Sequence, residues 1–160
     1  MQINTKKPLS TLLILSIGLI GAGAVLGSAT SKKDNVPTCA INSEKIHISN
    51  YEKTTFGKDS LKIKVRVNCN KKQLSTTVET KMFELIDGKE HLVVPFLPKN
   101  KTSNSGEYEF YFKNILRECL NLRKTVYKAH LKAHIKLIDN SVRDITGESE
   151  TSLPLACSFY

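Results

Sequence analysis

The 160-residue sequence lacks the short motifs that mark common catalytic sites. It contains no G-x-S-x-G nucleophile motif, no H-E-x-x-H zinc motif, no P-loop and no G-x-G-x-x-G dinucleotide motif. Its paired acids, Glu107 with Glu109 and Glu148 with Glu150, lie two residues apart, a spacing that the solvated face of a strand explains. The sequence therefore predicts that the protein is not an enzyme and uses no cofactor.

Charge is absent from a long apolar run near the start of the chain. The run extends from Leu9 to Leu26, follows Lys6 and Lys7, and ends in small residues up to Ala29. This is the pattern of a secretory signal peptide over residues 1–29. An uncleaved anchor is the alternative, because the run approaches the ~20 residues that cross a bilayer, but the glycines late in the run favour cleavage. We therefore predict a secreted or extracellular protein that can remain associated with the cell surface.

Acidic side chains are the minority in the exported part. Residues 30–37 have no apolar periodicity and are predicted to form a short tether before one domain over residues 38–160. The formal charge of the whole chain is +9, and removal of the leader takes away two lysines and no acid. The remaining 22 basic and 15 acidic side chains give a cationic domain with a charge of +7.

Cysteines are few and widely spaced: Cys39, Cys69, Cys119 and Cys157. No two are separated by the two to four residues that zinc sites favour, which argues against a metal centre. An even number in an exported domain predicts two disulfides, for which three pairings are possible. Turns near Phe56 and near Asn140 would place the first two cysteines opposite each other, and likewise the last two. The sequence therefore favours Cys39–Cys69 and Cys119–Cys157.

One stretch organises the rest of the chain, Thr125 to Asp139, T-V-Y-K-A-H-L-K-A-H-I-K-L-I-D. Apolar side chains occupy one parity from Tyr127 to Leu137, and lysines and histidines occupy the other. This period of two predicts a long strand with one buried face and one basic face. A helix is the alternative, because Ala, Leu and Lys favour helices and Leu131 and Ile135 are four residues apart.

Further strands follow from the same period. Residues 61–67 alternate cleanly, residues 78–86 and 92–94 flank a hairpin turn at Asp87-Gly88, and residues 108–112 alternate again. A short last strand is expected over residues 151–156, where Pro154 favours an edge position.

The remaining segments are predicted to be irregular. Residues 99–106, K-N-K-T-S-N-S-G, are expected to be a polar loop, and residues 139–147 another turn region. Residues 113–124 are expected to hold one short helical turn.

Six to eight short strands separated by turn residues predict an all-β fold, an immunoglobulin-like antiparallel β-sandwich with two disulfides. Tryptophan is absent, and the favoured disulfides join sequence neighbours, which separates the chain from true immunoglobulin domains. The layout resembles a group of small four-cysteine secreted proteins of Gram-positive bacteria, especially actinobacteria. The shared features are the leader, C-x-I at Cys39, a strand ending at Cys69, the Asp-Gly hairpin, Cys119 before a Tyr-led strand, and Cys157. The resemblance implies an architecture and a location, and no chemistry.

Of the four histidines, only His130 and His134 lie close together in the sequence. On a helix they would share a face and could chelate a metal. On a strand they would lie ~13 Å apart, too far for one ion, so the predicted strand makes them surface side chains.

Two basic faces are expected on the strands. One comprises Lys62, Lys64 and Arg66, and the other comprises Lys128, Lys132 and Lys136. No aromatic side chain is interleaved with these lysines to stack on bases, so we predict no specific nucleic-acid binding. Weak attraction to anionic surfaces is expected instead. Asn100-Lys101-Thr102 is a glycosylation sequon.

Two functions remain. The first is a non-catalytic module at the cell surface that binds a protein or glycan partner through loops 99–106 and 139–147. The second is an envelope-associated structural protein held to anionic polymers or lipids by the basic faces.

Overall fold

The computed structural model describes residues 36–93 and 96–160. The predicted signal peptide over 1–29 lies outside the described residues, as does the tether except for Val36 and Pro37. The chain divides into two units, 1–34 and 35–160, and the fold below is that of the second. None of the described helices has the length and apolar character needed to cross a membrane.

The domain is an antiparallel all-β fold, as predicted, and it also contains one short helix. Its elements, in order, are β1 (Cys39–Ser43), β2 (His47–Ile48), α1 (Asn50–Phe56), β3 (Ser60–Ile86), β4 (Lys89–Val93), β5 (Lys99–Glu118), β6 (Asn121–Leu137), β7 (Val142–Glu148) and β8 (Leu155–Ser158). The immunoglobulin-like assignment stays a prediction.

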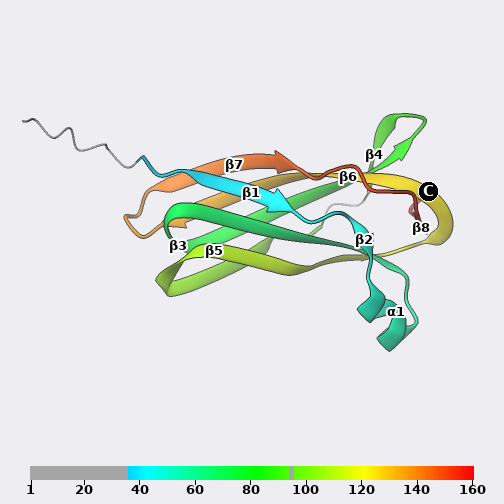
Figure 1. The fold of residues 1–160 in the computed structure, drawn as a ribbon, viewed down its shortest axis with the longest axis horizontal. Helices are drawn as coiled ribbons and strands as arrows, with labels where there is room; N and C mark the ends of the chain where they lie inside the picture. The colour runs from blue at the N-terminus through cyan, green and yellow to red at the C-terminus, as the bar shows by residue number, and fades with distance from the viewer. Residues whose placement is uncertain (1–35, 94–95) are drawn as a thin grey trace, which may run out of the picture. The chain divides into compact units, whose positions relative to one another are not determined.

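Two of these strands are long and double back on themselves (Figure 1). Residues 60–68 of β3, its first arm, pair with residues 109–118 of β5. Residues 73–86 form its second arm, of which residues 75–78 pair with residues 99–102 of β5. We call residues 99–102 the first arm of β5 and residues 109–118 its second arm. Each strand therefore contributes to both layers of the fold.

Gln73 holds the two bends together. Its side chain is fully buried, and its amide nitrogen donates to the carbonyl of Val67 at 3.0 Å and to that of Tyr108 at 2.8 Å. The amide oxygen accepts from Thr76. A buried amide needs such partners, so one side chain ties the bend of β3 to the bend of β5. Gly106, with φ of 70°, supplies the left-handed residue that the β5 bend requires.

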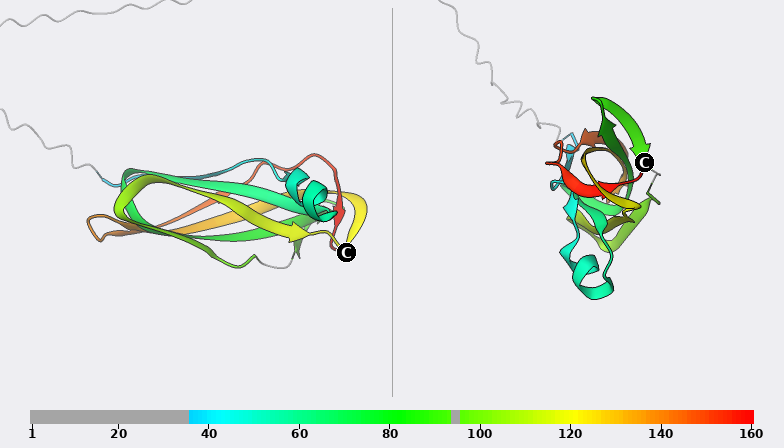
Figure 2. Two further views of the ribbon diagram at one scale, coloured as in Figure 1. Left: turned by 90° about the horizontal axis from the view of Figure 1, so that it is seen from below. Right: turned by 90° about the vertical axis from the view of Figure 1, so that its right-hand side faces the viewer.

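The first layer comprises β1, β2, the first arm of β3 and the second arm of β5. The second comprises the first arm of β5, the second arm of β3, β4, β6 and β7. Figure 2 shows these strands surrounding one core. On one side of the core, the edge strands β1 and β7 lie close together. Gly147 in β7 leaves so little space that a Cβ added there would lie 2.8 Å from Ile41 Cγ2 in β1. On the other side of the core lies β5.

The organising strand is confirmed, and the helical alternative is wrong. In β6 the buried side chains follow a strict period of two: Tyr127, Ala129, Leu131, Ala133, Ile135 and Leu137. They pack in one cluster with the alternating side chains of the first arm of β3: Leu61, Ile63, Val65 and Val67. The apolar pattern thus places both strands with one face on the core.

Both predicted disulfides are confirmed. Cys39 lies opposite Cys69 in the β1–β3 register, so the bond joins directly paired positions. Cys119, just after β5, is bonded to Cys157 in β8.

The predicted hairpin at Asp87-Gly88 is confirmed, since both residues have positive φ and β3 pairs with β4 across them. The predicted loop over 99–106 is wrong, because these residues lie in β5, and β7 occupies most of the predicted turn region over 139–147. The helical turn over 113–124 is also wrong, since β5 extends to Glu118 and β6 begins at Asn121. The last strand begins after Pro154 rather than at residue 151.

Helix α1 was not predicted, although the sequence signals it. Ser49 caps its first turn by accepting from the Glu52 amide, and Gly57 ends it with φ of 67°. A Ser three residues before a Glu is the capping-box pattern. The helix buries no side chain, so no apolar stripe marks it.

The β6–β7 turn is the one predicted over residues 139–141, and it is built around Asp139. Its carboxylate accepts from the backbone and side chain of Ser141 and lies 2.9 Å from Lys71 Nζ. Hydrogen bonds from Ser141, with Lys71 beside them, hold the pKa of Asp139 well below its ordinary value of 3.8. A lowered pKa in the folded state favours folding while the carboxylate is ionised.

We expect Asp139→Ala to destabilise the protein more at pH 7 than in acid. The ionised Asp139 carboxylate stabilises the wild-type protein fully above the pKa that this group has in the unfolded chain. This stabilisation is lost as the pH falls towards its lower pKa in the folded protein, so the difference in free energy of unfolding between the wild type and Asp139→Ala should shrink. Urea unfolding of both proteins at pH 7 and at about pH 2.5 measures it. Asp139→Asn, which keeps an acceptor for Ser141 but no titrating group, is the control. A difference that stays constant between the two pH values would contradict the role of the ionised carboxylate.

Candidate functional site

The first predicted basic face is largely neutralised by acidic neighbours. Lys64 Nζ lies 2.8 Å from Glu44, and Arg66 Nε lies 3.6 Å from Glu109. The Lys64 ammonium and the Tyr111 hydroxyl both donate to Glu44 and hold its pKa below the ordinary value. Lys62, at the end of this face, has no ion pair among the described residues. The three predicted residues are brought together on one strand, but they do not form a strong positive surface.

The second predicted face, on β6, is mixed. Lys128 lies 2.6 Å from Glu148 on β7 and 3.8 Å from Glu90 on β4. The hydrogen bond to Glu148 raises the pKa of Lys128 above its ordinary value. His130 lies between the same two carboxylates, at 3.5 and 3.6 Å. Of the three predicted lysines, only Lys132 and Lys136, further along the strand, have no ion pair among the described residues.

The histidine pair has the strand geometry. His130 and His134 lie on one face of β6, and His134 contacts Asp144 at 2.9 Å. Across residues 36–93 and 96–160, no group of His, Cys, Asp and Glu side chains has the geometry of a metal site.

A shallow hollow of about 320 Å³ lies on the outer face of the second layer, over β3, β6 and β7. Its charged lining contains both acids and bases, Glu79 and Glu148 as well as Lys81 and Lys132. Charges of both signs leave this hollow without a clear preference for an ion of either sign.

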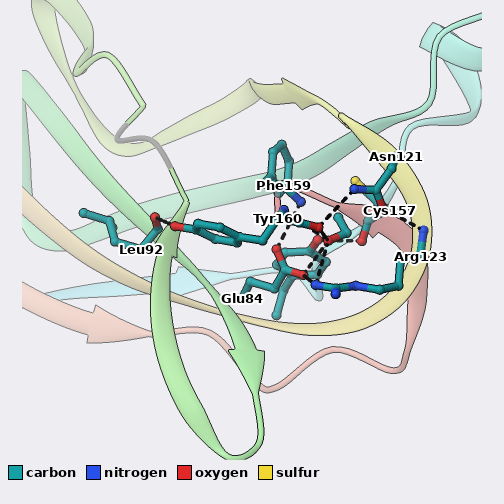
Figure 3. Close-up of polar contacts among 9 residues, drawn as sticks. Glu84, Leu92, Asn121, Arg123, Cys157, Phe159 and Tyr160 are labelled. Carbon is teal, nitrogen blue, oxygen red and sulfur yellow. Dashed lines mark hydrogen bonds and ion pairs between the residues drawn. The ribbon is translucent and has the colours of Figure 1, made fainter.

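A buried carboxylate, Glu84, lies in a network of polar contacts with the C-terminal residues (Figure 3). Glu84, in the second arm of β3, is fully buried because it shares the inward parity of Val78 and Met82. It accepts from the Ser158 hydroxyl at 2.7 Å and the Phe159 amide at 3.1 Å, and Arg123 lies 3.3 Å away.

Two tyrosines extend this network. The Tyr127 hydroxyl donates to the Cys157 carbonyl at 2.6 Å, and the Tyr160 hydroxyl donates to the Leu92 carbonyl at 2.6 Å. Burial raises the pKa of Tyr127, and the Glu84 charge adds to the rise. Because Ser158, Phe159 and Arg123 engage both carboxylate oxygens of Glu84, the network fastens residues 157–160 to β3 and β6 rather than presenting a reactive group.

The side of the domain along β5 carries a groove with two adjoining hollows. The first, of about 260 Å³, lies between the arms of β5 and is lined by Lys99, Asn100, Lys101, Tyr111, Phe112, Lys113 and Asn114. Lys101 reaches from the first arm across to the second, with its Nζ 5.9 Å from the centre of the Phe112 ring. Lys113 Nζ lies 5.4 Å from the Tyr111 ring centre. Aromatic faces thus support the ammonium groups without neutralising them.

The second hollow, of about 350 Å³, continues the groove and shares Lys99 and Asn114 with the first. Its other lining side chains are Phe96, Leu97, Leu116 and Arg117. Leu97 is 82% exposed, and Phe96 and Leu116 lie with it in the same hollow. The groove therefore has a cationic part and an apolar part.

Four cations line this groove and no acid does: Lys99, Lys101, Lys113 and Arg117. None of the four has an ion pair within the described residues. Like charges on facing walls raise the local positive potential and favour an anion between them. The groove is thus the strongest candidate site on the domain.

A β-bulge shapes the middle of the groove. The register with β3 shifts between Ile63 opposite Ile115 and Val65 opposite Phe112, which leaves Lys113 and Asn114 opposite the single residue Lys64. Because of this extra residue, Phe112 and Ile115 both point into the core although they are an odd number of residues apart. Asn114, between them, lines both hollows.

Sequence reasoning missed this groove. The sequence predicts a polar loop at the sequon Asn100 and its neighbour Lys101. It predicts a helical turn at Lys113 and Arg117. The available signal was the lysine-rich stretch before Tyr108 together with a second basic stretch after Phe112, but only the fold shows that the two arms face each other.

No protein-family model matches the sequence, and no curated protein matches it either. The resemblance to small four-cysteine proteins of Gram-positive bacteria therefore stays a prediction.

Proposed function

We propose that this protein is a secreted or cell-surface-associated, non-catalytic binding module that holds an anionic partner in the groove along β5. The two disulfides indicate an oxidising, extracellular environment, which agrees with export. A protein or glycan at the cell surface remains the expected class of partner. The contact surface differs from the predicted one, because residues 99–106 and most of residues 139–147 are strands rather than loops.

One observation carries this proposal: four cations converge on one concave surface that no acidic side chain lines. The predicted alternative, an envelope protein held by its two basic faces, has less support, since Lys64, Arg66 and Lys128 already contact carboxylates. Exposed ion pairs reduce the charge available to an external polymer.

The test is a pair of charge-reversal variants with equal net charge. We expect Lys101→Glu with Lys113→Glu to weaken binding to dextran sulfate, polyglutamate and inorganic polyphosphate by about tenfold or more, because both groove walls lose their cations. The matched control is Lys132→Glu with Lys136→Glu, on the exposed face of β6. Titration calorimetry at low and physiological salt measures both. Equal losses in the two variants would show that net charge, and not the groove, attracts the anion.

A further inference from the structure

We infer that the groove receives an extended polypeptide segment that adds as a strand to β5, with acidic and apolar side chains on the face towards the groove. This inference rests on the proposed function, because it names the chemistry of the anionic partner.

The backbone of β5 offers a free edge. Within the described residues, β5 pairs with β3 and with no other strand, whereas β6 pairs with β3, β7 and β8. A strand has amides and carbonyls on both sides, so the second arm of β5 directs half of them away from the sheet. In Figure 1 β5 follows the lower border of the domain, with no strand beyond it. Such an edge accepts an extended peptide through main-chain hydrogen bonds.

The side chains indicate a peptide rather than a polyanion. A polyphosphate or a sulfated glycan would satisfy Lys101 and Lys113, but it has no apolar group to cover Leu97 and Leu116. A peptide strand can supply both kinds of group. Side chains on one face of a strand are separated by an even number of positions. In the bound peptide, the acid over the first hollow and the apolar residue over the second should therefore be an even number of positions apart.

A second copy of the chain fits the groove less well. Pairing two β5 edges would bring Lys101, Lys113 and their counterparts from the other copy together, and like charges across a pair of strands are unfavourable. The bulge at Lys113 and Asn114 also interrupts the regular edge, a common device against self-association. It divides the edge into residues 109–112 and 115–118, so the added strand pairs with one of these segments.

The inference can be tested by selecting peptides of about ten residues, the length of a long strand, from a random display library. The bait is the full, oxidised protein. We expect the enriched peptides to carry Asp or Glu separated from an apolar residue by an even number of positions. Binding should weaken about tenfold or more in the Lys101→Glu, Lys113→Glu variant and remain close to wild type in the Lys132→Glu, Lys136→Glu control. On binding, hydrogen exchange should slow at amides within residues 109–118.

Two further comparisons separate strand addition from simple charge attraction. N-methylation of alternate amides on the pairing edge of an enriched peptide should abolish its binding without changing its charge. Leu97→Ser, at an exposed position that the fold does not require, should weaken the peptide but leave dextran sulfate binding unchanged.

The outcomes distinguish the two proposals. If no such peptides are enriched, or if the N-methylated peptide binds as well as its parent, the strand-addition inference is wrong. Groove-dependent binding of dextran sulfate without peptide binding would overturn this inference and leave the proposed function standing. Binding of neither would overturn both.

Discussion

Replacement of Glu84 by alanine is expected to lower the free energy of unfolding by about 3 kcal/mol, with an upper range of about 5 kcal/mol. The carboxylate accepts from the Ser158 hydroxyl and the Phe159 amide inside the domain, and its loss leaves the Phe159 amide without this acceptor and the Ser158 hydroxyl with only the Tyr160 carbonyl at 3.1 Å. Arg123 is half exposed and can return to water, so most of the effect comes from the lost hydrogen bonds to Ser158 and Phe159 and from the cavity.

Glu79→Ala is the matched control for this prediction. Glu79 lies on the same arm of β3 but on its exposed parity, and its loss should change the free energy of unfolding by no more than about 0.5 kcal/mol. Glu84→Gln keeps the shape and one acceptor oxygen, and it should fall between the wild type and Glu84→Ala. Urea unfolding monitored by circular dichroism ranks the four proteins. If Glu84→Ala proved as stable as Glu79→Ala, the buried network would not hold the C-terminal segment.

The second large effect is expected in β6. Leu131→Ala should cost about 2 to 5 kcal/mol, because Leu131 is buried in the common core and its truncation removes packing and leaves a cavity. Lys132→Ala, the next residue, points to solvent and should stay within about 0.5 kcal/mol. Chemical denaturation of both variants gives the two values. Similar losses at both positions would contradict a strand with one buried face.

The strands that the sequence predicts are those with one solvent-exposed face and one buried face. β6 and the first arm of β3 have this asymmetry, and their alternation is complete. The first arm of β5 does not, because Lys99 to Thr102 are all exposed at the edge of the sheet. A strand that is wet on both faces has the composition of a loop, so only its pairing with β3 identifies it.

The candidate site was less predictable than the fold for a related reason. Lys101 and Lys113 lie in different arms of β5, and their proximity depends on the bends at Gln73 and Gly106. The predicted basic faces were real rows of lysines, but their acidic partners come from other strands. Glu44 and Glu148 are far from Lys64 and Lys128 in sequence, and periodicity within one strand carries no information about such neighbours.

The two disulfides divide the domain into covalent rings and an open span. One ring encloses residues 39–69 and the other residues 119–157, so residues 70–118 lie in neither. This open span contains all of β5 and therefore every arm that forms the groove. A disulfide reduces the conformational entropy that the loop it closes gains on unfolding. Residues 70–118 are closed by neither disulfide, so they gain their full conformational entropy when they unfold. Local opening should thus begin within residues 70–118, so β5, the strand best placed to receive a partner, is among the elements that the covalent framework restrains least.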